Sequence, residues 1–142
     1  MFYDIGALNI TGSLRWETHA NVGVLLVGLG YSPDPGHTYV SEVSTWELGG
    51  AGAHRLLTVP GRTRTLDSVN HRILFDASDL TFLSLPLAVG TPYYAIYYDT
   101  TNASDATREL IGREPLVSPK APDGSDYTIR HPTGGIWSLP TL

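Results

Sequence analysis

A chain of 142 residues is long enough for one domain with a single sizeable hydrophobic core. Hydrophobic residues make up 42% of it and charged residues only 16%, which excludes a disordered chain. The net charge of −5 offers no basic field to nucleic acid phosphates, and the absence of cysteine excludes disulfides and thiolate metal sites. So few charges leave much of the surface neutral, which favours contacts with other subunits over a free monomer.

The amino-terminal residues and the apolar runs argue against export and against a membrane. Asp4 lies where a signal peptide needs a positively charged region. The most apolar run, Val22 to Leu29, is far shorter than the roughly 20 residues that cross a bilayer. We therefore expect no membrane partner and no export by the usual route.

The first half of the chain predicts one buried strand and one hairpin. Asn21 to Leu29 is rich in branched residues, which is typical of a buried strand. Thr38 to Val43 is interpreted as one helical turn, with a short strand as the alternative. Arg55 to Val59 and Arg62 to Leu66 flank Pro60-Gly61, a strong turn dipeptide, and so predict a hairpin.

The second half of the chain predicts short strands separated by turns. Tyr93 to Asp99 is the clearest of them because it is dominated by aromatic residues. Leu116 to Ser125 is interpreted as a loop, and the last two strands bracket His131 to Gly135 as a second hairpin. The expected strands are Arg72–Phe75, Leu80–Leu83, Tyr93–Asp99, Arg108–Ile111, Tyr127–Arg130 and Ile136–Leu139.

These elements define the expected fold class. No segment keeps a helical period over three turns, and turn signals recur every 8–15 residues or so, roughly the spacing of sandwiches and barrels. The sequence therefore predicts an all-β fold, a single β-sandwich or jelly-roll-like barrel with long loops, over residues 1–142. Residues 1–12 and 134–142 are expected to extend from this domain as arms that reach neighbouring subunits.

Five histidines raise the question of a metal site. None of them lies at an i, i+4 or H-x-H spacing with another, and none stands beside a second ligand in a recognised pattern. We therefore expect no metal and no cofactor. The histidines are His19, His37, His54, His71 and His131.

Two groups of acidic residues are interpreted as turns. Asp123-Gly124-Ser125-Asp126 resembles the start of a calcium loop, but Tyr127 to Pro132 supplies no acid to complete one. In an Asx-type turn the side chain bonds the backbone two residues on, which explains these residues better. The same interpretation applies to Asp76 and Asp79.

The spacing of reactive residues does not indicate an enzyme. No serine lies in a G-x-S-x-G elbow, and no Ser-His-Asp order is distinctive. Gly28-Leu29-Gly30 stops short of a dinucleotide fingerprint, and the only lysine, Lys120, lies in a proline-rich loop without a phosphate-binding motif. We therefore expect no catalytic and no cofactor-binding residues.

The strand predicted at Tyr93–Asp99 carries tyrosines on both faces. Tyr94 and Tyr98 share one face, and Tyr93 and Tyr97 share the other. One face should be core. The other forms a sugar-stacking platform or a protein interface, or it is buried as well inside a sandwich.

Several segments in order resemble small structural proteins of tailed bacteriophages. In those proteins a GxGYxR-like turn, an FDADDVTF-like segment, an apolar strand ending in Tyr-x-Asp and a Leu-Ile-Ala-like segment recur. This sequence departs from that pattern at Ala53-His54, where an aromatic residue is more common, and at Ile111-Gly112, where alanine is common. The matching segments are Gly50–Arg55, Thr63–Asp67, Phe75–Phe82, Ala95–Asp99 and Glu109–Gly112.

The resemblance implies a β-sandwich that sits on the assembled virion. Within that class it favours a capsid decoration (cement) protein, a minor capsid protein that binds the outside of the phage head and bridges major capsid protein subunits. Its partners would be the major capsid protein and further copies of the chain in a homotrimer, with no nucleic acid. The protein would be made in the host cytoplasm and found on the capsid surface.

Two alternatives stay open. One is a structural protein of the tail or of the head–tail connector. The other is a carbohydrate-binding adhesion module that binds a host-surface glycan through the tyrosine strand. Polarity, loop position and aromatic content give the candidate interface residues, which are Phe2, Tyr3, Tyr31, His37, Tyr39, Trp46, Tyr97 and Trp137.

Overall fold

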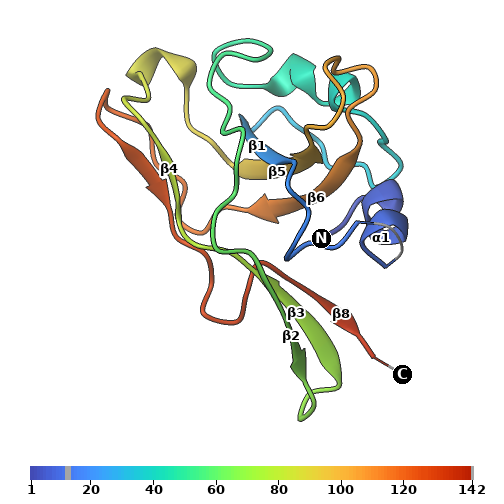
Figure 1. Ribbon diagram of the computed structural model, residues 1–142. Helices are drawn as coiled ribbons and strands as arrows, with labels where there is room; N and C mark the ends of the chain where they lie inside the picture. The colour runs from blue at the N-terminus through green and yellow to red at the C-terminus, as the bar shows by residue number, and fades with distance from the viewer. Residues whose placement is uncertain (12–13, 142) are drawn as a thin grey trace.

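The protein is all-β, as its sequence predicts. The computed structural model describes residues 1–11 and 14–141. Its elements are α1 (Asp4–Thr11), β1 (Val22–Val27), η1 (Val40–Glu42), η2 (Ser44–Trp46), β2 (Thr63–Asp67), β3 (Arg72–Asp76), β4 (Leu80–Phe82), η3 (Leu87–Val89), β5 (Tyr94–Asp99), β6 (Leu110–Pro115), β7 (Tyr127–Ile129) and β8 (Trp137–Pro140). The described residues form three antiparallel sheets, with strand orders β1-β5-β6, β2-β3-β8 and β4-β7 (Figure 1).

The central sheet, β1-β5-β6, is buried on both faces. Val24 pairs with Tyr97, and Leu25 pairs with Ile96. Because successive residues of a strand point to opposite faces, these two pairs lie on different sides of the sheet. Tyr97 and its neighbour Tyr98 are both fully buried, each in a different apolar cluster. The two-sided burial confirms that both faces of the tyrosine strand belong to the core.

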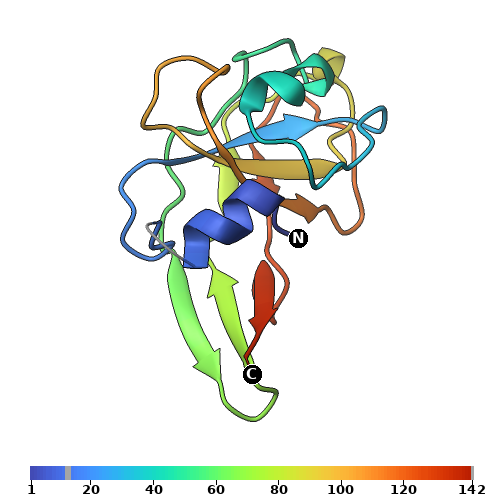
Figure 2. The same ribbon diagram turned by 90° about the vertical axis from the view of Figure 1, so that its right-hand side faces the viewer.

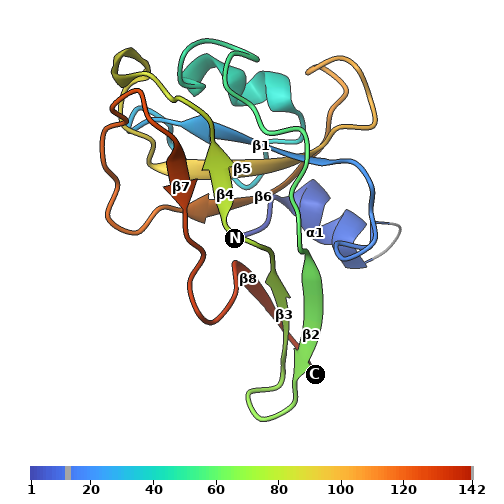
Figure 3. The same cartoon turned by 60° about the vertical axis from the view of Figure 1, so that its left-hand side comes forward.

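A separate layer covers each face of the central sheet. On one face, β4 and β7 bring Leu80 and Ile129 into the apolar cluster that contains Tyr97. Figure 3 shows β4 and β7 in front of the central sheet. On the other face, Val40 of η1 packs in the cluster that contains Leu25. The layered arrangement gives the domain its sandwich-like character.

Residues 1–11 lie against the edge of β6, where the sequence predicts a free arm. Phe2 forms a bridge with Gly112, and the backbone amide of Tyr3 donates to the carbonyl of Ile111 at 3.2 Å. The helix α1, blue in Figure 2, follows and packs against the same strand. These residues are therefore part of the domain, and Gly12, the end of the predicted arm, lies outside the described residues.

Gly6 is the point of closest approach between α1 and β6. A Cβ atom on Gly6 would lie 1.8 Å from the carbonyl oxygen of Ile111, a backbone atom that cannot turn aside. We expect Gly6→Ala to lower the free energy of unfolding by about 2 kcal/mol, because α1 must move away from the sheet. Urea unfolding measures the loss. Gly134→Ala is the control, since nothing lies within 4 Å of its added Cβ, and equal stability of the two variants would contradict the close packing of α1.

The hairpin predicted around Pro60-Gly61 is wrong. Leu56 exchanges two backbone hydrogen bonds with Val24 of the central sheet, at 2.8 and 2.9 Å. β2 pairs instead with β3. Pro60-Gly61 still makes a turn, with φ of +64° at Gly61, but this turn leads the chain from the central sheet to β2. Residue alternation identifies the buried face of a strand and leaves its partner open, which is why the pairing differs.

The second predicted hairpin is wrong for the same reason. β7 pairs with β4, placing Thr128 opposite Thr81, and β8 pairs with β3, placing Trp137 opposite Phe75. The turn residues 131–135 thus carry the chain from one sheet to another. β6 also begins later and ends later than predicted, at Leu110–Pro115.

Candidate interaction surface

One of the three sheets projects from the body of the domain. We call residues 63–76 and 137–140, which contain β2, β3 and β8, the arm. Figure 1 shows it extending below the central sheet, with the carboxyl terminus at its side. Every residue of β2 except Asp67 is exposed. The predicted carboxyl-terminal arm, residues 134–142, therefore pairs with β3 of its own chain through residues 137–140, and Leu142 lies outside the described residues.

The arm has an apolar face that continues outward from the core. Phe75 and Trp137 lie side by side at its base and are buried. Two positions further out on the same face, Ile73 lies between Leu66 and Leu139. Ile73 and Leu139 are half-buried, and Leu66 is 64% exposed. The outer end of this face therefore presents apolar surface to solvent.

Trp137 holds the arm against the domain. Its indole Nε1–H donates to the carbonyl of Arg113 at 2.8 Å. Its ring centroid lies 4.8 Å from that of Tyr97, 5.2 Å from that of Trp16 and 4.9 Å from that of Phe2. Contacts of this kind stabilise a fixed ring geometry, so the arm has a defined direction relative to the core.

The tip of the arm is a closed polar turn with one exposed apolar side chain. The carboxylate of Asp67 accepts hydrogen bonds from the amide of Asn70 at 2.8 Å and from Nε of Arg72 at 2.9 Å. Hydrogen bonds from Asn70 and then Arg72 lower the pKa of Asp67 to about 2. Val69, between these partners in the chain, is 85% exposed.

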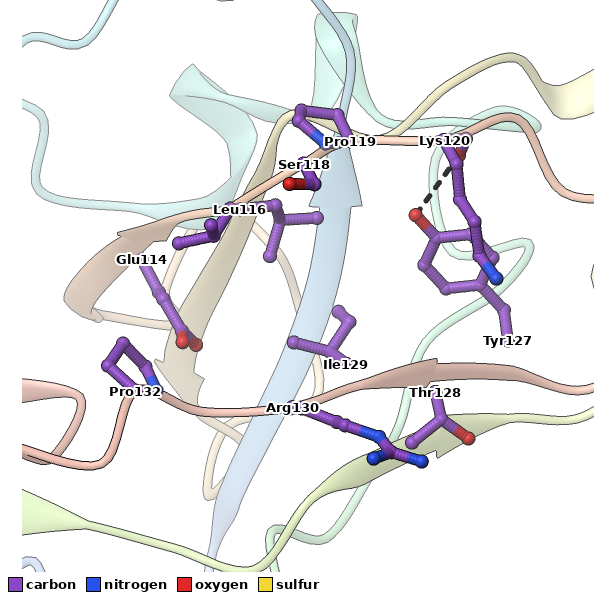
Figure 4. A pocket seen from close by; sticks show the side chains of 11 residues that line it. Glu114, Leu116, Ser118, Pro119, Lys120, Tyr127, Thr128, Ile129, Arg130 and Pro132 are labelled. Atoms are coloured by element: carbon purple, nitrogen blue, oxygen red, sulfur yellow. Dashed lines mark hydrogen bonds between the residues drawn. The ribbon is translucent and has the colours of Figure 1, made fainter.

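Both edges of the small β4-β7 sheet border hollows. We call the one beside β7 the β7 groove. It has a volume of about 260 Å³ and is lined by segment 114–120 on one side and segment 127–132 on the other (Figure 4). Leu116 and Ile129 face each other across it, and Lys120 and Arg130 lie at its margins. The hollow at the other edge, also about 260 Å³, is lined by residues 53–56 and by Phe82, Leu83 and Leu85.

Arg55, which lines the second of these hollows, forms a buried ion cluster. It donates to both carboxylate oxygens of Glu47 at 2.6 Å and to both oxygens of Asp105 at 2.7 and 2.8 Å. The side chains of Arg55 and Glu47 are only 5% and 2% exposed. Such a fully paired cluster fixes three loops relative to one another and has no group free for catalysis.

His131, Glu114 and Tyr97 form a second buried polar network. The Nδ1 of His131 lies 3.0 and 3.1 Å from the two carboxylate oxygens of Glu114, and the hydroxyl of Tyr97 donates to Glu114 at 2.9 Å. The Nε2 of His131 contacts the carbonyl of Ser78 at 3.1 Å. Both ring nitrogens therefore face acceptors, and neither is open to accept a proton from a substrate.

The remaining residues that could bind a ligand form turns or lie far from one another. The carboxylate of Asp123 accepts the backbone amide of Ser125 at 3.0 Å, which confirms the Asx-type turn. Over residues 1–11 and 14–141, no three His, Asp or Glu side chains gather as metal ligands would. Within the same residues, no helix has the length and apolar character to cross a membrane.

The eight predicted interface residues fall into two groups. Those in the first group pack inside the domain, because large aromatic side chains bury the most area in a core; they are Phe2, Tyr3, Tyr31, Tyr97 and Trp137. A buried side chain offers no surface to a partner, so the interior positions correct the prediction for these five. The residues of the second group lie on segment 37–46 and are at least partly exposed, so their role in an interface stays a prediction. They are His37, Tyr39 and Trp46.

The outer residues of the arm were not predicted from the sequence. Leu66 and Val69 are both exposed. Leu66 was predicted only as the last residue of a hairpin strand, and no element was predicted at Val69. The signal for Leu66 was that it is the single apolar residue in Thr63–Asp67, an otherwise polar segment. That signal identifies an apolar face and cannot show that the face projects into solvent.

Comparison with known proteins adds no family to this description. The chain matches no protein-family model, no curated protein sequence and no solved structure. The fold and the surfaces described above are therefore the basis for the function proposed below.

Proposed function

We propose that this protein is a structural component of a phage virion, a capsid decoration protein that binds the outside of the head. The observation that carries the proposal is the arm, whose apolar face leaves Leu66 64% exposed at its outer end. Exposed apolar surface on a projecting element is typical of a contact with another subunit. The low charge of the chain and its resemblance to phage structural proteins support the same class.

A decoration protein needs binding and no chemistry. If it binds only the expanded form of a shell, it shifts the shell's equilibrium toward that form by its free energy of binding. Repetition of the site around a symmetry axis adds avidity, so that each interface can be small. An arm that reaches a neighbouring major capsid protein subunit, or a second copy of this chain in a trimer, would supply such a contact.

The proposal is tested by mixing the purified protein with empty phage shells. We expect it to bind expanded shells at about one copy per symmetric position and to leave unexpanded shells bare, as measured by sedimentation. Its presence in purified tails at a few copies per particle would contradict the head assignment and favour the tail or connector alternative.

Leu66→Ser tests the arm as the contact. Because Leu66 is 64% exposed in the isolated chain, we expect the variant to keep its free energy of unfolding within about 0.5 kcal/mol. Its affinity for expanded shells should fall about tenfold, since a buried leucine contributes roughly 1.5–3 kcal/mol. Leu29→Ser, at a leucine that is 74% exposed outside the arm, is the matched control. Equal shell binding by both variants would contradict a role for the arm.

The tyrosine strand does not support the glycan-binding alternative. Tyr97 and Tyr98 are both buried, so β5 presents no tyrosine platform on which a sugar could stack. A glycan-binding function would need another surface, and a glycan array probed with the intact chain measures it directly.

A further inference from the structure

The β7 groove is bordered by open backbone. Among the described residues, β7 pairs with β4 alone in a two-stranded sheet, so alternate N–H and C=O groups on its other edge face the groove. On the opposite wall, the amide of Leu116 donates to the carbonyl of Tyr93 at 2.9 Å. Beyond it, the amides of Val117 and Ser118 have no backbone partner in the described part of the chain. Both walls thus offer backbone groups to an extended segment between them.

Two of the three exposed cations that lack a carboxylate partner among the described residues line the same groove. Four arginines pair with carboxylates: Arg55, Arg64, Arg72 and Arg108. Arg62 donates to backbone carbonyls and Arg113 is buried. The exposed cations without a carboxylate partner among the described residues are Arg15, Lys120 and Arg130, and the last two line the groove. Because these two unpaired cations lie together in a chain of net charge −5, the groove favours an anionic partner.

Glu114, the acidic residue in the lining of the groove, does not oppose this selection. Its side chain is only 4% exposed, and its carboxylate accepts hydrogen bonds from His131 and Tyr97. An anion that enters the groove therefore meets Lys120 and Arg130, while the charge of Glu114 is already compensated.

We propose that the β7 groove binds an extended, acidic segment of a partner protein, which adds as a strand beside β7. Side chains of an extended segment alternate between two faces. Apolar residues on one face pack on Leu116, which is half-buried, and carboxylates on the other face pair with Lys120 and Arg130. The inference goes beyond the virion role and holds for whichever assembly contains the chain.

The probe is a short peptide with alternating acids, acetyl-Thr-Asp-Val-Glu-Val-Asp-Thr-amide, titrated into the isotope-labelled protein and followed by amide NMR. We expect shifts at residues 117–120 and 128–130, with a dissociation constant of about 1 mM or lower. The same peptide with Asn and Gln in place of its acids should bind about tenfold more weakly. A version N-methylated at both valines should lose binding, because it cannot complete the strand pairing.

Charge reversal identifies the protein groups. Lys120→Glu combined with Arg130→Glu should weaken binding of the acidic peptide about tenfold or more, whereas Arg15→Glu, at an exposed cation outside the groove, should leave it unchanged. Because all three positions are exposed, the variants should fold normally, and the salt dependence of the unaltered protein gives an independent readout. Absence of binding, equal binding of the acidic and neutral peptides, or shifts elsewhere would each overturn the proposal, and none of these outcomes bears on shell binding.

Discussion

Replacing Arg55 with methionine is expected to lower the free energy of unfolding by about 3–5 kcal/mol. The guanidinium donates twice to Glu47, at 2.6 Å for both bonds. Methionine fills similar volume but donates nothing, so the carboxylate of Glu47, only 2% exposed, remains buried without a cation. An uncompensated buried charge is among the most destabilising single changes in a folded protein.

The loss extends to the loop that carries Asp105. Arg55 donates to both carboxylate oxygens of Asp105, and this hydrogen bond is the main reason that the pKa of Asp105 lies below its usual value. Arg55 also lies over the ring of Tyr98, 5.5 Å from its centroid. One side chain thus joins segment 47–55, the loop at residue 105 and the buried strand β5.

Two variants separate buried charge from lost packing. Arg55→Met combined with Glu47→Leu removes both charges, so we expect it to recover most of the lost stability. Arg64→Met breaks the ion pair between Arg64 and Glu17, whose side chains are 36% and 25% exposed respectively. This variant should lower the free energy of unfolding by only about 0–1 kcal/mol. Urea unfolding measures all three variants. A loss below about 1 kcal/mol for Arg55→Met alone would contradict the importance of this cluster.

Local patterns in the sequence predicted individual strands well. The apolar run at Val22–Val27 and the aromatic run at Tyr94–Asp99 each form a strand because both faces of these segments are buried. The Asx-type turn at Asp123 was also predicted, since the side chain that makes it bonds a residue only two positions away. Features decided within a few residues are visible in the sequence.

Features decided between distant residues were not predicted. β3 pairs with β8, more than 60 residues later, and this pairing creates the arm. The single leucine in Thr63–Asp67 shows an apolar position at Leu66, but only the pairing determines that this position projects into solvent. The β7 groove has the same origin, because one of its walls contains β7, whose position depends on its pairing with the distant β4.

The buried network at His131 predicts that stability falls as pH rises above neutrality. Burial disfavours the charge on His131, but the hydrogen bond and charge of Glu114 outweigh that effect and raise the pKa of His131 above its usual 6.5. Both ring nitrogens face acceptors, Glu114 at 3.0 Å and the carbonyl of Ser78 at 3.1 Å, so both must carry protons. Burial raises the pKa of Tyr97 well above its usual value, which keeps its hydroxyl a donor to Glu114 throughout this range.

The sign of the pH dependence follows from the direction of the shift. Because the folded pKa of His131 lies above the unfolded value of 6.5, its contribution is complete below pH 6.5 and is lost as pH rises through the folded pKa. Between the two pKa values the loss is about 1.4 kcal/mol per pH unit. The Met1 amino group acts in the opposite direction, since burial, with Arg113 nearby, lowers its pKa from 8.0 to about 6.

His131→Gln isolates the contribution of the histidine from this background. Glutamine keeps a polar side chain but does not titrate, and the Met1 amino group and the other histidines are the same in both proteins. Urea unfolding of both proteins is measured from about pH 5.5 to about pH 9, roughly the range of histidine and amine titration. As the pH rises, we expect the free energy of unfolding of the unaltered protein to fall relative to that of the variant. The variant's lower absolute stability does not affect the comparison, because the readout is the slope with pH. Parallel curves would contradict a charged His131 in the folded protein and would mean that the proton between His131 and Glu114 does not leave in this range.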